Sequence, residues 1–271
     1  MIARMKEFIE KNPNNKSLKL EFAKALRVSM NAISSKGLPA VMESFLGELQ
    51  HLAESDPLDS SLHEELAQAS HEIARFWRKR GEFKSLRTHM KKFREFAKKF
   101  PDNEEIKLNL TKSLVVEIDS TDRKDITVVN QILDEIKVLS ESVPTNRHLQ
   151  LEWVYAYLKA MERAEETPED SLKWIKSMKE IVDNNKGENF RLALAKGYLS
   201  AISSIGRSNK EALDEQLEEI GKLADTTKES IELQMIYAQS LIASLQIQGI
   251  ANFAETKKIL DKFELLIEEF T

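Results

Sequence analysis

The apolar positions of this chain follow a helical period over nearly its whole length, and the same arrangement returns six times. Offsets of zero, four and seven residues fall on one face of a helix, because each residue turns the chain by about 100°. Each arrangement starts at one apolar anchor, and the anchors are spaced 44, 44, 43, 41 and 41 residues apart. The anchors are Leu18, Leu62, Ile106, Leu149, Phe190 and Ile231.

Seven residues beyond every anchor the side chain is small, which lets a neighbouring helix approach closely. These residues are Ala25, Ala69, Ser113, Ala156, Gly197 and Ala238. Two positions beyond most anchors a leucine points to the opposite side, so the helix is apolar on two sides. A helix of this kind needs two neighbours, as the inner helix of a stacked array does.

A second helix of different character follows each inner helix. It has one apolar stripe and one heavily charged face, which is typical of a half-exposed outer helix. The expected outer helices cover residues 38–55, 82–99, 127–142, 168–184, 209–225 and 255–270.

Glycine and proline lie at the boundaries that this division predicts. Glycines follow four inner helices, where a left-handed residue ends a helix well: Gly37, Gly81, Gly206 and Gly249. Four prolines follow outer helices: Pro13, Pro57, Pro101 and Pro144. Pro39 and Pro168 suit the first turns of outer helices, with Thr167 as a cap for the second.

The pattern therefore predicts an all-α fold, a right-handed α-α superhelix of about thirteen antiparallel helices. We expect one domain over residues 1–271. Its repeats are a half repeat at 1–13 and full repeats at 14–57, 58–101, 102–144, 145–186, 187–227 and 228–271.

The turns between repeats carry a family resemblance. The sequences NPNN and DPLD follow the first two outer helices. Nine positions beyond the four prolines that follow outer helices lies an apolar residue: Phe22, Leu66, Leu110 and Trp153. Ala23 and Ala67 then supply small residues. On these residues the chain resembles the tetratricopeptide-repeat (TPR) family, although the family's early aromatic position holds Lys19, His63 or Lys107. The repeats also exceed the family's usual ~34 residues, so the resemblance implies a TPR-like α-solenoid.

Composition narrows the class of protein. Charged residues make up 31% and hydrophobic residues 41% of the chain, as in a soluble helical protein. There is no cysteine, which excludes disulfides and thiolate chemistry. The N-terminus lacks the apolar core of a signal peptide, and the most apolar window, 233–253, is interrupted by polar residues. We therefore expect a cytoplasmic protein that does not span a membrane.

Signatures of catalysis are absent from the sequence. It contains no phosphate-binding glycine loop, dinucleotide-binding motif or serine-hydrolase motif. His63 and His71 are eight residues apart, roughly 12 Å along a helix, whereas helical metal ligands lie three or four residues apart. A solvated surface is the favoured interpretation of this pair, and His51, His89 and His148 are isolated. We expect no catalytic residue, cofactor or metal; an enzyme site assembled across repeats is the remaining alternative.

The polar side of the inner helices is the first candidate site. Residues three and six beyond each anchor share the sector that packing leaves polar, and solenoid grooves bind extended or helical peptides there. The second position of each pair supplies a candidate partner-binding groove: Lys24, Gln68, Lys112, Tyr155, Lys196 and Tyr237. The three lysines and two tyrosines predict a mildly cationic groove with aromatic anchors. The alternative is that these residues only solvate the groove.

The second candidate site is basic. Between residues 75 and 99 there are eleven cations and two acids, a net charge of +9. The basic patch comprises Arg75, Arg78, Lys79, Arg80, Lys84, Arg87, Lys91 and Lys92, with further cations up to Lys99. Residues 208–271, by contrast, carry thirteen acids and six bases, a net charge of −7. Cations at this density attract phosphates or acidic segments, but on an outer helix they can equally serve only to keep it soluble.

The sequence thus favours a non-catalytic scaffold that binds a protein or peptide in its concave groove. The alternative is an RNA- or phosphate-binding module that uses the basic segment 75–99, so a nucleic-acid partner is the less favoured expectation. Oligomerisation through the repeat ends is a further route, because the basic segment and the acidic end attract each other.

Overall fold

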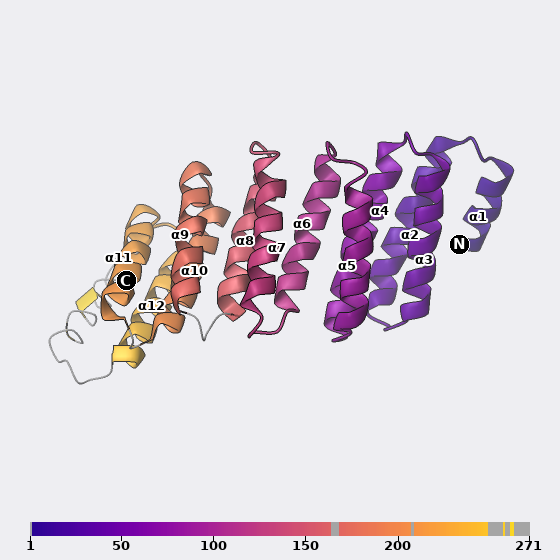
Figure 1. The fold of residues 1–271 in the computed structure, drawn as a ribbon. Coiled ribbons are helices and arrows are strands. Elements are labelled where there is room, and N and C mark those ends of the chain that lie inside the picture. Colours follow the sequence, from indigo (N-terminus) through magenta and orange to yellow (C-terminus); the bar gives the residue numbers. More distant parts are fainter. Residues whose placement is uncertain (1, 164–167, 207–208, 249–256, 258–260, 263–271) are drawn as a thin grey trace. The chain divides into compact units, whose positions relative to one another are not determined.

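The computed structural model describes residues 2–163, 168–206, 209–248, 257 and 261–262, which form twelve helices and no strand (Figure 1). The helices are α1 (Ile2–Lys11), α2 (Lys16–Ser34), α3 (Pro39–Ser55), α4 (Ser60–Lys79), α5 (Phe83–Ala97), α6 (Glu104–Asp119), α7 (Ile126–Glu141), α8 (Arg147–Arg163), α9 (Pro168–Asn184), α10 (Glu188–Ile205), α11 (Lys210–Thr226) and α12 (Ile231–Gln248). Most of the last outer helix expected at 255–270, together with Thr167 and Gly249, lies outside the described residues.

The chain divides into two compact units, residues 1–120 and 121–271. In the first unit the inner helices α2, α4 and α6 pack side by side, and α3 and α5 cover them. In the second unit the inner helices α8, α10 and α12 pack in the same way beneath α9 and α11, and α7 packs on α8. Each unit is thus a two-layer array of neighbouring antiparallel helices, which confirms the all-α solenoid expected from the sequence. That residues 1–271 form one domain stays a prediction.

Local sequence explains where the inner helices begin and end. The side chains of Asn15, Asp59 and Asn103 accept hydrogen bonds from the backbone N–H groups of Leu18, Ser61 and Ile106 at 2.9–3.1 Å. Asn146 accepts one from the N–H of Leu149 at 3.1 Å. Three of the glycines expected after inner helices have positive φ: Gly37, Gly81 and Gly206, at 66°, 70° and 58°.

The core follows the anchors in five of the six repeats. Leu62, Ile106, Leu149 and Phe190 are at most 3% exposed, and Leu18 is half-buried. The small residues that follow the middle anchors, from Ala69 to Gly197, are buried between helices. At Gly197 a Cβ would lie within 3.0 Å of side chains on α9 and α8, so the close approach of neighbouring helices that a small residue predicts is present there.

The sixth repeat corrects the sequence register by two residues. Ile231 and Met235 are 65% and 58% exposed, whereas Leu233 is fully buried. The N–H of Gln234 donates to the carbonyl of Ser230, as Lys19 donates to Asn15 in the first repeat, so the sixth anchor is Leu233. Seven residues on lies Ser240, which is small and fully buried, in place of Ala238. The sequence misplaced the anchor because α12 carries apolar residues on all sides.

This register makes a direct prediction about stability. Leu233→Ala should lower the free energy of unfolding by about 2–5 kcal/mol, because it leaves a cavity between buried helices. Ile231→Ala removes an exposed side chain and should change the free energy by less than about 0.5 kcal/mol. Equilibrium unfolding in urea distinguishes the two variants, and a larger loss for Ile231→Ala would restore the register expected from the sequence.

Candidate functional site

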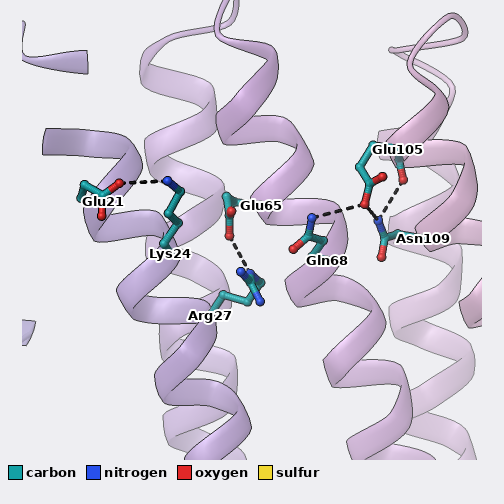
Figure 2. A network of polar contacts seen from close by, with 7 residues as sticks. All are labelled: Glu21, Lys24, Arg27, Glu65, Gln68, Glu105 and Asn109. Atoms are coloured by element: carbon teal, nitrogen blue, oxygen red, sulfur yellow. Dashed lines mark hydrogen bonds and ion pairs between the residues drawn. The ribbon is translucent and has the colours of Figure 1, made fainter. Parts of the chain in front are cut away.

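The polar faces of the inner helices in the first unit are joined by a network of hydrogen bonds and ion pairs (Figure 2). Arg27 on α2 donates from Nε to Oε2 of Glu65 on α4 at 2.6 Å. Gln68 on α4 donates to Oε1 of Glu105 on α6 at 3.3 Å, and Asn109 donates to the same carboxylate at 2.9 Å. This polar row links each inner helix to the next.

The polar row differs in exposure from one end to the other. Glu65 and Asn109 are 8% and 3% exposed, so their contacts stabilise the helix array. Lys24 pairs instead with Glu21 on its own helix at 2.9 Å, and both side chains are largely exposed. Lys112 is half-buried and lies close enough to His71 to affect its pKa. The Glu21 carboxylate thus offsets part of the mildly cationic character expected from the lysines alone.

The second unit places two of the expected groove residues on accessible helix faces. Lys196 on α10 reaches Glu232 on α12 and forms an ion pair at 2.8 Å, with 46% and 57% of the two side chains exposed. Tyr155 on α8 is half-buried. An aromatic side chain and an exposed ion pair therefore remain available on these inner helices.

The placement of Tyr237 is a correction. Its side chain is only 9% exposed and faces the outer helix α11, where a Cβ built on Gly221 would lie 3.3 Å from the Tyr237 hydroxyl oxygen. The two-residue error in the sixth register placed this tyrosine on the polar side. With Leu233 as the anchor, the position six residues on is Gln239, which is exposed.

Three residues with polar contacts between inner helices were missed by sequence reasoning: Arg27, Glu105 and Glu232. Arg27 lies nine residues beyond the first anchor, and Glu105 lies one residue before the third anchor. Both positions continue the polar sector by one helical turn, so extending the search to these offsets would have found them. Glu232 lies one residue before Leu233 and binds Lys196 just as Glu105 binds Gln68.

The basic patch lies on the last turn of α4, the turn that follows it, and α5. Arg78 pairs with Asp119, Arg94 pairs with Glu117, and Arg80 donates to Glu82 and to the carbonyl of Gly37. Arg75 pairs with Glu72. Arg78, Arg80 and Arg94 thus tie neighbouring elements of the first unit together, whereas the Arg75 pair lies within α4.

The remaining cations of this segment form an exposed surface. Lys98 pairs with Glu95 at 2.9 Å, whereas the other six have no ion-pair partner within the described residues. They are Lys79, Lys84, Arg87, Lys91, Lys92 and Lys99. Phe93 is 2% exposed, and Phe76 and Trp77 are also buried, so these three aromatic residues belong to the core. Phe96 is half-buried, whereas Phe83 at the start of α5 is 42% exposed. The exposed cations of α5 can attract anions by charge alone.

The sequence favoured a solvated surface for His63 and His71, and the structure corrects this for both; it also buries His89, which the sequence showed only as isolated. His63 is 5% exposed and its Nε2 contacts the carbonyl of Pro57 at 3.2 Å. His71 contacts the Ser113 hydroxyl at 3.2 Å, and burial, followed by Arg75 and Lys112, lowers its pKa to about 4. Among the described residues, no cluster of three or more acidic or histidine side chains could hold a metal ion.

His89 gives the chain a pH-dependent stability. Its Nε2 donates to the carbonyl of Ser70 at 2.8 Å, and burial lowers its pKa to about 4. A histidine in the unfolded chain titrates near 6.5, so between pH 6.5 and 4 the unfolded state binds more protons. The free energy of unfolding should therefore fall as the pH falls through this window, by up to about 3 kcal/mol for this residue.

Urea unfolding between pH 7 and pH 4.5 measures this effect. His89→Gln keeps a donor for the Ser70 carbonyl but does not titrate, so its stability should depend less steeply on pH than that of the wild type. His51→Gln, at an exposed position, is the matched control and should keep the wild-type slope. Identical slopes for all three proteins would contradict the prediction.

The fold and these surfaces define an all-α helical-repeat protein. Comparisons of the chain with protein-family models, curated proteins and solved structures found no match. No helix in the described part of the chain combines the length and apolar character needed to cross a membrane.

Proposed function

We propose that this protein is a non-catalytic, TPR-like scaffold that binds a peptide or protein segment along the polar side of its inner helices. The supporting observation is the set of accessible polar side chains on the inner helices of each unit. In the first unit they are Lys24 and Glu21 on α2, and in the second they are Tyr155, Lys196 and Glu232 on the consecutive inner helices α8, α10 and α12. Stacked inner helices present such side chains at regular intervals, which suits an extended or helical partner. The cytoplasmic location expected from the sequence stays a prediction.

Lysine substitutions in the row test this function. The triple variant Lys24→Ala, Lys112→Ala, Lys196→Ala should lose most partner capture, because it removes the cations that would meet an incoming carboxylate or carbonyl. The matched control removes three exposed lysines outside the row, Lys36, Lys137 and Lys173, and should keep it. Both variants should unfold at the wild-type urea midpoint. Equal capture by the two variants would rule out the groove.

The exposed cations of α5 support a second candidate function, which is binding of RNA or another polyphosphate. Lys84, Arg87, Lys91 and Lys92 project from one outer helix and have no ion-pair partner among the described residues. Affinity for single-stranded RNA should fall with salt at a log–log slope of roughly 0.7 per phosphate contact. Replacing Arg87, Lys91 and Lys92 with glutamine should flatten that slope, and a slope that is flat in the wild type would eliminate this function.

A further inference from the structure

A cavity of about 680 Å³ opens between α9, α10 and α11 in the second unit. This volume lies within the ~300–1,000 Å³ typical of ligand pockets. Five carboxylates line it: Glu180, Asp183, Glu211, Glu215 and Glu219. Only two cations, Lys176 and Lys179, share the lining, and Leu172, Ile175 and Ala212 supply apolar contacts. The cavity has no residue in common with the polar row of the inner helices.

Most of the negative charge in this cavity is not neutralised. Glu219 pairs with Lys179 and also with Lys222 at 3.0 Å. The other four carboxylates have no ion-pair partner among the described residues. Tyr198, also in the lining, is 2% exposed, and burial, followed by the charges of Glu219 and Asp183, raises the pKa of its hydroxyl. The negative potential therefore extends to the buried wall of the cavity.

A second observation points to a ligand that donates hydrogen bonds. Gln216 lines the cavity and is 5% exposed, yet its side-chain oxygen has no hydrogen-bond partner. Buried amide oxygens are normally paired, because an unpaired one costs free energy. Because Gln216 belongs to the lining, a donor that enters the cavity and contacts this side chain would supply the missing partner. The lining therefore suits a cation that carries N–H groups.

We propose that this cavity binds the side chain of a lysine or arginine from a basic segment of a partner protein. The apolar side chains of Leu172, Ile175 and Ala212 would cover the methylene stem, and the unpaired carboxylates would receive the charged head. Charge complementarity and the unpaired acceptor carry this assignment. The site lies against the outer helices and goes beyond the groove of the proposed function.

The test measures binding of a labelled peptide of alternating lysine and alanine to the full chain, by fluorescence anisotropy. Saturable binding is expected, and the same peptide with glutamine in place of lysine should not bind. The double variant Asp183→Asn, Glu215→Gln should weaken binding by about tenfold or more, because it removes two unpaired carboxylates. The matched control, Glu218→Gln with Glu229→Gln, removes the same charge from exposed positions outside the cavity and should bind almost normally.

Gln216→Leu leaves the net charge unchanged and separates side-chain insertion from general attraction. This substitution should also weaken binding of the lysine peptide, because it removes the unpaired acceptor. Circular dichroism of each variant verifies that the helices are intact. Equal weakening by the cavity and control variants, or no saturable binding by the wild type, would overturn the proposal. If spermine binds more tightly than the peptide, the conclusion that a protein segment occupies the cavity is wrong.

Two further measurements identify the source of the basic segment and separate the cavity from the groove. The first measurement uses a peptide of residues 83–99 of this chain. If it binds more tightly than the alternating peptide, and if the cavity variant abolishes self-association of the chain, the proposal is supported with a second copy of this chain as the partner. The triple variant of Lys24, Lys112 and Lys196 should bind the peptide normally, so failure of the groove and failure of the cavity are distinguishable.

Discussion

Replacing Trp174 with alanine should lower the free energy of unfolding by about 3–5 kcal/mol, among the largest losses expected from a single substitution in this chain. The indole is 1% exposed, and α9 packs it against neighbouring helices of the second unit. Its Nε1 also donates to Oδ1 of Asn130 on α7 at 3.1 Å. Alanine removes both the apolar contacts and this link between two outer helices.

Trp174→Phe separates the two contributions. Phenylalanine keeps most of the packing and loses the hydrogen bond to Asn130, so the loss should be only about 1–2 kcal/mol. Urea unfolding followed by far-UV circular dichroism measures both variants, because the tryptophan signal itself is altered. A loss below 1 kcal/mol for alanine, on the scale of a surface substitution, would show that Trp174 is not a core residue.

Gly197→Leu should lower the free energy of unfolding by about 1–3 kcal/mol through overpacking. A Cβ built on Gly197 would lie 2.8 Å from Cδ1 of Ile175 and from Sδ of Met178 on α9. It would also lie 3.0 Å from Cε of Met161 on α8. These distances are below van der Waals contact, so the larger side chain must displace the ends of these three side chains on two neighbouring helices.

Gly47 supplies the control for Gly197. It lies in the outer helix α3, and a Cβ built on it would have no neighbour within 4 Å. Gly47→Leu should therefore be neutral or stabilise the chain by up to about 1 kcal/mol, because leucine favours a helix more than glycine does. Equal effects at the two glycines in urea unfolding would contradict the close inner-helix approach inferred from the repeat.

Much of the fold could be predicted because its signals are local in the sequence. Helix starts at Asn15 and Asn103 follow from capping chemistry, and the ends at Gly37 and Gly81 follow from positive φ. The small residue seven positions beyond each anchor predicted close helix packing and located Gly197. Each of these features depends on a few residues within one helix or turn.

In the sixth repeat the apolar pattern alone does not determine the register of the helix. In α12 the apolar residues Ile231, Leu233, Met235 and Ile236 leave no polar side to fix the register. Tertiary packing buries Leu233 and exposes Ile231, and the turn at Ser230 agrees with that choice. The packing of neighbouring helices decides between anchors two residues apart, and the sequence alone does not give that packing.

The candidate sites were less predictable than the fold because their partners come from other repeats. Arg27 meets Glu65 and Lys196 meets Glu232 across 38 and 36 residues of sequence, and one sequence gives no sign of such pairs. The acidic cavity likewise combines residues of α9, α10 and α11. The sequence indicates where polar and charged residues gather, but which charges remain unpaired depends on how the repeats stack.

The most direct test of the scaffold function is affinity capture with the intact chain from a lysate of its source cells, before and after nuclease treatment, with elution in steps of salt. We expect a discrete protein that survives nuclease and is absent when the bait carries alanine at Lys24, Lys112 and Lys196. Nucleic acid in the eluate, or proteins that disappear on nuclease treatment and at modest salt, would contradict the scaffold function and favour the cations of α5 as the working site.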